Sequence, residues 1–305
     1  MMGVQLALIR RELLEHRSLY VVPAVLALLI VLVDVTGQAT LNVYGKHIDA
    51  ALLGATHVGV HERAALISAM LAMLSWLFVS TMWLLVIFYT LDSLFAERKD
   101  KSILFWRSLP VTDSETVISK LLTATIVIPL ITLAFIAATH ILVLIATSIW
   151  VGSKGANAWH LIWEAAPLLD NWGATLIVIL AVIAWLSPYV GWFLLVSSYT
   201  KRSPMLVAML PIIVLPLFEK LLFSSETLMN QVWLRVPQIP IYQSINVDGI
   251  FDEEMFKIVG DEGISLIALL DVGKFMTSPS MRGGIFVCGL FTTAAIFVRR
   301  YRGES

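Results

Sequence analysis

His140 is the residue best suited by type to move a proton, because its imidazole lies near the middle of a long apolar run. Ionisable groups at membrane depth are costly and are often functional, and imidazole titrates near neutral pH. Asp92 could serve as a second titratable group in a carrier driven by protons or sodium. A plain hydrogen bond between helices is the simpler interpretation of His140, and solvation by lipid headgroups explains Asp34 and Asp92.

Metal chemistry has little support in the sequence. A methionine ladder for copper(I) needs side chains on one helical face, but Met82 lies nearly opposite Met70 and Met73. Cys288 is the single cysteine, which excludes an intrachain disulfide and a thiolate cluster. The acids 252–254 lack the spacing of a calcium loop and are interpreted as a solvated face. We therefore expect no metal in this chain.

Enzyme motifs are missing from the sequence. It contains no phosphate-binding loop, no HExxH pair and no Gly-x-Ser-x-Gly elbow. The glycine-rich stretch 152–155 lacks the spacing of a phosphate loop. We expect no ATPase activity and no cofactor here, and an intramembrane enzyme acting on lipid lacks paired catalytic residues at one depth.

The elements that position these residues are predicted to be membrane helices. The chain has 305 residues, of which 58% are hydrophobic and 14% charged, and its net charge is -1. A soluble domain carries about 25% charge, and no basic field exists to attract nucleic acid. Runs of about 20 apolar residues cross a bilayer as helices. Six such spans are predicted, at Ser18 to Val35, Ala64 to Leu94, Val117 to Trp150, Gly173 to Tyr199, Pro204 to Phe223 and Gly283 to Val298, in one transmembrane domain over residues 1–305.

Lysine and arginine are concentrated in one set of short connecting segments, and such segments are usually cytoplasmic. These residues are Arg10, Arg11, Arg17, Arg98, Lys99, Lys101, Arg107, Lys120, Lys201, Arg202, Arg299, Arg300 and Arg302. Both termini should therefore be cytoplasmic, in a multi-pass protein of the bacterial inner membrane.

Two further elements are expected outside the spans. Met2, Leu6, Ile9 and Leu13 fall on one helical face, which predicts an N-terminal amphipathic helix on the inner membrane surface. The segment 224–280 between spans five and six is long, acidic and external, and its run 264–270 is predicted to form a surface or re-entrant helix. Four prolines, Pro129, Pro188, Pro211 and Pro216, predict kinked or broken spans.

Between spans two and three the chain reads ERKDKSILFWRSLP, from Glu97 to Pro110. The charged opening, the apolar and aromatic middle and the terminal proline predict a short helix parallel to the inner membrane surface. Thr112 or Ser114 is a candidate N-cap for the next helix, with Glu115 in its first turn. A basic loop anchored to anionic lipid is the other interpretation.

This segment resembles the cytoplasmic loop of type-2 ATP-binding-cassette permeases, which carry an acidic-basic pair, a polar turn, an apolar run and Arg-Ser-Leu-Pro. Lys101 departs from the pattern, which often has glycine there. The resemblance implies an all-α, six-helix exporter bundle in which the loop forms a coupling helix docked on a separate nucleotide-binding subunit. The implied contact residues are Glu97, Arg98, Lys99, Asp100, Lys101, Ser102, Ile103, Phe105, Trp106, Arg107 and Pro110.

The same resemblance implies the partners and the mechanism. Two permease chains, with a homodimer favoured, would pair with two soluble ATPase subunits that bind ATP and magnesium. Alternating access would then export hydrophobic or amphipathic cargo such as lipids, glycans, peptides or drugs. The alternative is a self-sufficient ion-coupled carrier that uses His140 as a pathway residue.

Overall fold

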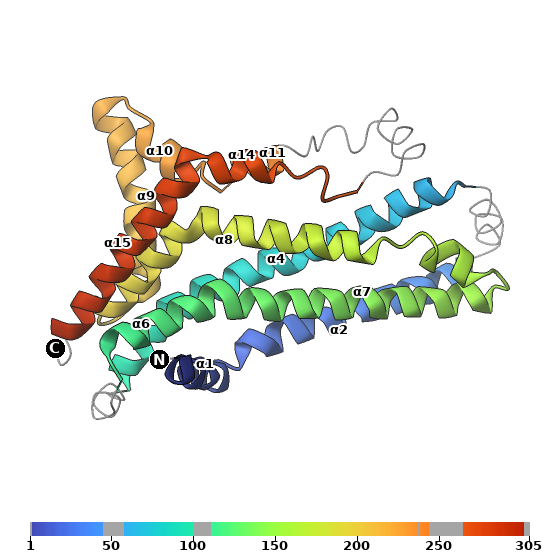
Figure 1. Cartoon of the computed structure of the whole chain (residues 1–305), viewed down its shortest axis with the longest axis horizontal. Helices are drawn as coiled ribbons and strands as arrows, with labels where there is room; N and C mark the ends of the chain where they lie inside the picture. Colours follow the sequence, from blue (N-terminus) through green and yellow to red (C-terminus); the bar gives the residue numbers. More distant parts are fainter. Residues whose placement is uncertain (1, 45–57, 101–110, 237, 244–264, 302–305) are drawn as a thin grey trace.

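The structure, a computed structural model, describes residues 2–44, 58–100, 111–236, 238–243 and 265–301. Among these residues no strand occurs (Figure 1). Six stretches are helical, long and apolar enough to cross a membrane, and they coincide with the six predicted spans. Their helices are α2 (Ser18–Tyr44), α4 (Val60–Lys99), α6 (Asp113–Leu122) continued by α7 (Ile128–Ser153), α8 (Leu168–Tyr199), α9 (Pro204–Phe223) and α15 (Pro279–Tyr301). The chain is an all-α, multi-span membrane protein.

Three of the spans, Val60–Lys99, Asp113–Ser153 and Trp159–Tyr199, are much longer than a bilayer requires. Helix α4 has 40 residues, and a helix of that length measures about 60 Å at 1.5 Å per residue. The hydrocarbon core of a membrane is only about 30 Å thick. The helices on both sides of segment 101–110 therefore extend beyond the lipid or tilt strongly, as their apolar lengths predict.

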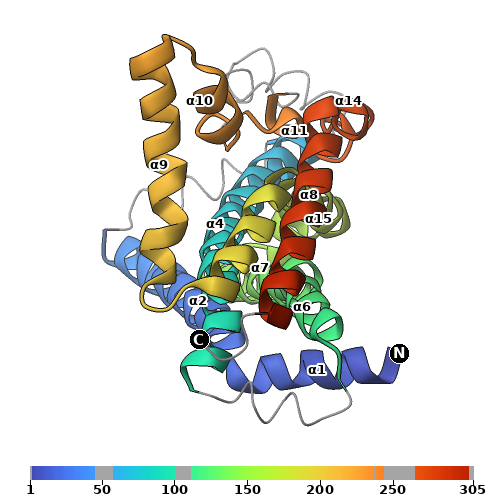
Figure 2. The same cartoon turned by 90° about the vertical axis from the view of Figure 1, so that its left-hand side faces the viewer.

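Helix α1 (Met2–Glu15) lies across one end of the bundle (Figure 2), which we call the α1 end. The C-terminal end of α15 lies at the same end (Figure 1). The predicted N-terminal helix is thus present, but its orientation differs from a simple amphipathic pattern. Leu8 and Glu12 are buried against the bundle, whereas Leu6 is exposed. A carboxylate on the predicted polar face therefore points into the protein.

Helix α8 is central to the bundle and packs against both α4 and α15. The contact between α8 and α15 is close at Gly191, where an added Cβ would lie 2.8 Å from the backbone oxygen of Cys288. Small residues let membrane helices approach closely. Gly191 therefore sets the distance between these two helices.

The entry into the third span begins with a capping box. The Thr112 hydroxyl accepts a hydrogen bond from the Glu115 backbone N–H at 3.1 Å, and Glu115 accepts one from the Thr112 N–H at 2.9 Å. This confirms the Thr112 N-cap. Between α6 and α7 lies a π-helical turn, η1 (Thr123–Val127), next to Pro129, which has no N–H to donate. Helices α8 and α9 run unbroken through Pro188, Pro211 and Pro216.

The opposite end of the bundle carries the short helices α10 (Thr227–Val232), α11 (Pro240–Gln243) and α14 (Val272–Thr277). The helix predicted over 264–270 is wrong for its described part, because residues 266–269 form turns. Asp170 explains the difference. Its carboxylate accepts hydrogen bonds from the Ser265 hydroxyl and, at 2.6 Å, from the Leu266 backbone N–H.

Candidate functional site

Charged side chains from four helices meet inside the protein at the α1 end. We call this group the ion cluster, and its members are Arg11 and Glu12 of α1, Glu97 of α4, Asp113 and Lys120 of α6, and Arg299 of α15. Four of them are almost fully buried, with exposed fractions of 1% for Glu12, 4% for Glu97, 0% for Lys120 and 4% for Arg299. These four are two acids and two bases, so their formal charges cancel.

Glu97 is the centre of the ion cluster. Its Oε2 lies 2.6 Å from Nη1 of Arg299, and its Oε1 lies 3.1 Å from Nζ of Lys120 and 3.2 Å from Nη2 of Arg11. One carboxylate therefore holds cations from α15, α6 and α1 together. Arg299 extends the network through its Nε, which is 3.0 Å from Oδ1 of Asp113.

Lys120 connects Glu97 to the N-terminal helix. Its ammonium donates to Oε1 of Glu12 at 2.9 Å, while the Tyr89 hydroxyl donates to Oε2 of the same carboxylate at 2.9 Å. His16 packs edge-on against Tyr89, with 5.0 Å between ring centroids. Glu12 thus has partners from both α4 and α6, and it fixes α1 to the ends of two spans.

The pKa of Arg11 reflects this surrounding charge. Burial acts to lower it, but the hydrogen bond with Glu15 and the charges of Glu97, Glu15 and Glu12 raise it above its ordinary value. Arg11 is therefore a permanent cation.

Removing one partner from a buried pair costs roughly 3–5 kcal/mol, because the other charge is left uncompensated. The ion cluster accordingly couples four helix ends in one arrangement.

The predicted contact residues fall into three groups in the structure. Glu97 is buried in the ion cluster, and Arg98 is half-buried and donates from Nη2 to the Ser197 and Thr200 carbonyl oxygens at 2.6 and 2.8 Å. A cation that binds the last carbonyls of a helix stabilises its end. Lys99 and Asp100 are exposed. The remaining predicted residues, Lys101, Ser102, Ile103, Phe105, Trp106, Arg107 and Pro110, lie outside the described part of the chain.

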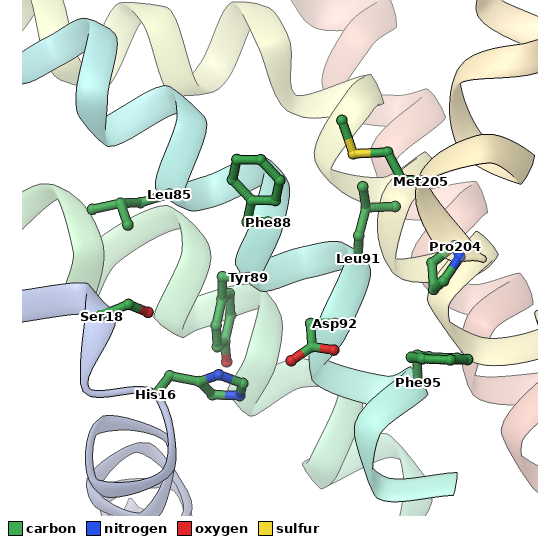
Figure 3. A pocket seen from close by; sticks show the side chains of 10 residues that line it. All are labelled: His16, Ser18, Leu85, Phe88, Tyr89, Leu91, Asp92, Phe95, Pro204 and Met205. Atoms are coloured by element: carbon green, nitrogen blue, oxygen red, sulfur yellow. The ribbon is translucent and has the colours of Figure 1, made fainter. Parts of the chain in front are cut away.

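A pocket of about 370 Å³ lies beside the ion cluster. Figure 3 shows its polar side, where His16, Tyr89 and Asp92 come together, and its apolar side, which includes Phe88 and Met205. The hydroxyl of Tyr89 that binds Glu12 belongs to this wall. The pocket therefore combines polar and apolar groups directly next to the buried charges.

His140 lies far from the ion cluster, fully buried between α4, α7 and α8. Its Nδ1 accepts a hydrogen bond from Trp172 Nε1 at 3.3 Å, and its Nε2 is 3.4 Å from the Ser75 hydroxyl. Ser75 in turn accepts a bond from Thr175 at 3.3 Å. This local network is an interhelical hydrogen-bond site, and the pathway role of His140 stays a prediction.

Sequence reasoning did not identify Glu12 or Lys120 as members of a site. Glu12 lies outside the apolar face formed by Met2, Leu6, Ile9 and Leu13, and the sequence shows Lys120 only as a basic residue of an inner segment. The signal for Lys120 was its position inside the apolar stretch VISKLLTATIV, where a lone cation requires a partner. Its partners could not be named, because Glu97 and Glu12 come from other helices and lie far from it along the chain, Glu12 by 108 positions.

Comparisons with known proteins do not add a family to these observations. No family model matches the chain, and neither a curated protein nor a solved structure is similar to it. The ion cluster and the six spans therefore provide the basis for a functional proposal.

Proposed function

We propose that this chain is the transmembrane subunit of an ATP-driven transporter of the type-2 ATP-binding-cassette kind, and that segment 97–110 couples it to a separate ATPase subunit. The observation that supports this proposal best is the placement of the ion cluster. Glu97 and Arg98 precede residues 101–110, and Asp113 and Lys120 follow them. Both ends of the proposed coupling segment are thus fixed to buried partners.

Such an arrangement transmits displacement. A force applied to residues 101–110 acts on Glu97 and Asp113, which both bind Arg299 of α15. The same force reaches α1 through Lys120 and Glu12, and it reaches α8 through Arg98. Buried networks with a few discrete arrangements can carry coupling between distant sites. Five helix ends, those of α1, α4, α6, α8 and α15, therefore move as one unit in the proposed mechanism.

Charge distribution supports a cytoplasmic location for the α1 end. The described basic residues at that end include Arg10, Arg17, Lys99, Lys201 and Arg300, and lysine and arginine mark cytoplasmic segments. In this orientation Lys99 and Asp100 are presented to a soluble partner. Two ATPase subunits with ATP and magnesium, and a second permease chain, complete the proposed complex in a bacterial inner membrane.

In this mechanism the ATPase subunits bind the inward and outward states of the bundle unequally, and ATP binding shifts the population between them. Export of hydrophobic or amphipathic cargo is the proposed result. The mixed polar and apolar pocket beside Tyr89 is consistent with amphipathic cargo.

The decisive experiment is reconstitution of the chain with an ATPase subunit that co-purifies with it. Lys99→Glu is the sharpest variant, because Lys99 is exposed and its change leaves the ion cluster untouched. Facing like charges at an interface costs several kcal/mol, so stimulated ATP turnover should fall by roughly tenfold or more. Lys274→Glu, also an exposed lysine but at the opposite end, is the matched control.

Three results would contradict the proposal. The first is that no ATPase co-purifies with the chain. The second is that Lys99→Glu turns over ATP as fast as the control variant. The third is gradient-driven flux in vesicles that contain this chain alone, which is the behaviour of the ion-coupled carrier.

A further inference from the structure

A cavity of about 730 Å³ is lined by residues of α8, α9, α10 and α15. Its volume is within the range of about 300–1,000 Å³ that is usual for ligand pockets. Most of its wall is apolar and includes Pro188, Trp192, Pro211, Leu215, Val287 and Phe291. Figure 2 shows α9 set apart from α15, with α8 between them.

Arg235 is the cation at the head of this cavity. Its side chain is buried, with 7% of the residue exposed, and its guanidinium lies over the Trp185 ring at 4.6 Å. Nε donates to the Trp185 carbonyl oxygen at 2.8 Å, and Nη2 donates to the Ser280 carbonyl oxygen at 2.9 Å. These bonds hold the guanidinium in one position.

The charge of Arg235 has no acidic partner among the described residues. Burial lowers the pKa of Arg235 below its ordinary value, and among the residues that the structure describes the opposing effect comes from Tyr189. Nη1 makes no hydrogen bond to the described part of the chain. Arginine carries five N–H donors and suits phosphate and carboxylate groups. A buried cation that is held in one position and faces a cavity therefore favours the binding of an anion in that cavity.

The residues that line the cavity indicate that the ligand has an apolar part in addition to its anionic group. From Ser280 to Phe291, helix α15 rises about 16 Å, and the Trp192 and Phe291 rings, 5.5 Å apart, lie at the far end of the lining. Leu215 lines the cavity and is exposed, so we expect it to contact lipid in a membrane-spanning helix. The cavity is thus bordered by residues that contact acyl chains.

From these features we infer that the cavity binds one anionic phospholipid, with its phosphate at Arg235 and an acyl chain along α15 toward Phe291. The site is selective because a zwitterionic lipid brings its own cation to Arg235. Gly284 is part of the site, since an added Cβ there would lie 2.3 Å from Nη2 of Arg235. The inference needs no ATPase subunit and is independent of the proposed transport function.

Lipid retention by the purified full chain, measured by native mass spectrometry, tests the inference. The probes are phosphatidylglycerol and phosphatidylcholine with the same acyl chains, and glycerol 3-phosphate as a soluble anion. Charge-assisted hydrogen bonds contribute about 1.5–3 kcal/mol. We therefore expect phosphatidylglycerol to bind about tenfold or more tighter than phosphatidylcholine, and glycerol 3-phosphate not to displace it.

Two variants and two controls separate the features of the site. Arg235→Gln should bind both lipids equally weakly, whereas Arg282→Gln, at an exposed arginine, should behave as the wild type. Gly283→Leu should weaken the binding of both lipids, because Gly283 lines the cavity and has open space at its Cβ. Gly289→Leu, on the same helix and equally open, is its control, and it does not touch Arg235.

The inference is overturned if Gly283→Leu retains phosphatidylglycerol as the wild type does, or if a folded Arg235→Gln keeps the preference for it. It is also overturned if glycerol 3-phosphate competes as well as the lipid, since the site would then serve a soluble anion. Gly283→Leu decides the question alone if Arg235→Gln does not fold.

Discussion

Arg299 and Glu97 form an ion pair of 2.6 Å across 202 positions of the chain, and both side chains are buried. Glu97→Gln removes the charge that Arg299, Lys120 and Arg11 share. We expect a loss of roughly 3–5 kcal/mol in stability, because these cations lose the carboxylate that they share, although Asp113, Glu12 and Glu15 still pair with them. The melting temperature of the detergent-purified chain is the measurement. Asp100→Asn, an exposed change three residues away, should stay within about 0.5 kcal/mol of the wild type, and an equal effect of both changes would contradict the role of Glu97.

Lys120 and Glu12 should behave as a coupled pair. Lys120→Met leaves two carboxylates facing each other, whereas the double variant with Glu12→Gln removes one of these charges together with the lysine. Residues in direct contact show interaction energies of about 0.5–3 kcal/mol. The double variant should therefore be more stable than the sum of the single changes predicts. A double-mutant cycle on melting curves checks this, and strict additivity would show that the 2.9 Å contact contributes nothing.

The packing of α8 on α15 predicts that Gly191→Ala is destabilising. The new methyl group would meet the backbone of Cys288, at 2.8 Å from its oxygen and 3.0 Å from its Cα, and backbone atoms cannot rotate away. Overpacking of this kind costs typically about 1–3 kcal/mol. Gly289→Ala, which meets nothing within 4 Å, should be neutral or slightly stabilising because alanine favours the helix. Similar melting temperatures for the two variants would argue against the close approach.

The proposed orientation can be read from cysteine labelling in intact cells. Cys288 is the single cysteine and is buried. The variant Cys288→Ser therefore provides a chain without any cysteine that maleimide could label. Lys274→Cys should react with a membrane-impermeant maleimide, while Lys99→Cys should react only after the membrane is opened. The reverse pattern would place the α1 end outside the cell and exclude its contact with a cytoplasmic ATPase.

His140→Leu separates the two transport classes. The change leaves the Trp172 N–H without its acceptor, which costs about 1–3 kcal/mol for a buried group. In an ATP-driven transporter the folded variant should retain ATP-dependent transport at a comparable rate. Complete loss of transport in a variant that stays folded at the assay temperature would instead support the ion-coupled carrier. Ser148→Ala, which removes the acceptor of the Trp163 N–H, is a matched control for the lost bond.

The membrane architecture follows from the sequence because its signals are local. Every predicted span is helical, and Thr112 and Glu115 form the expected cap, since hydropathy and capping depend on neighbours along the chain. The ion cluster depends on tertiary contacts between distant positions, so the sequence shows its members only as separate charges. Arg235 belongs to the segment 224–280 that the sequence predicts to be external, and its buried bonds to Trp185 and Ser280 depend on tertiary contacts in the same way. Asp170 was overlooked because its partners lie about one hundred positions further along.

The ion cluster also bears on how the protein is made. Its members are widely separated along the chain, with Arg11 and Glu12 in α1, Glu97 to Lys120 around segment 101–110, and Arg299 in α15. During synthesis Glu97 leaves the ribosome long before Arg299, so the cluster cannot close until α15 arrives. A chain truncated before Arg299 would leave Glu97 without that cation, and the cell's proteases would meet a loosened α1 end. Helix α15 therefore completes the part of the protein that α1 begins.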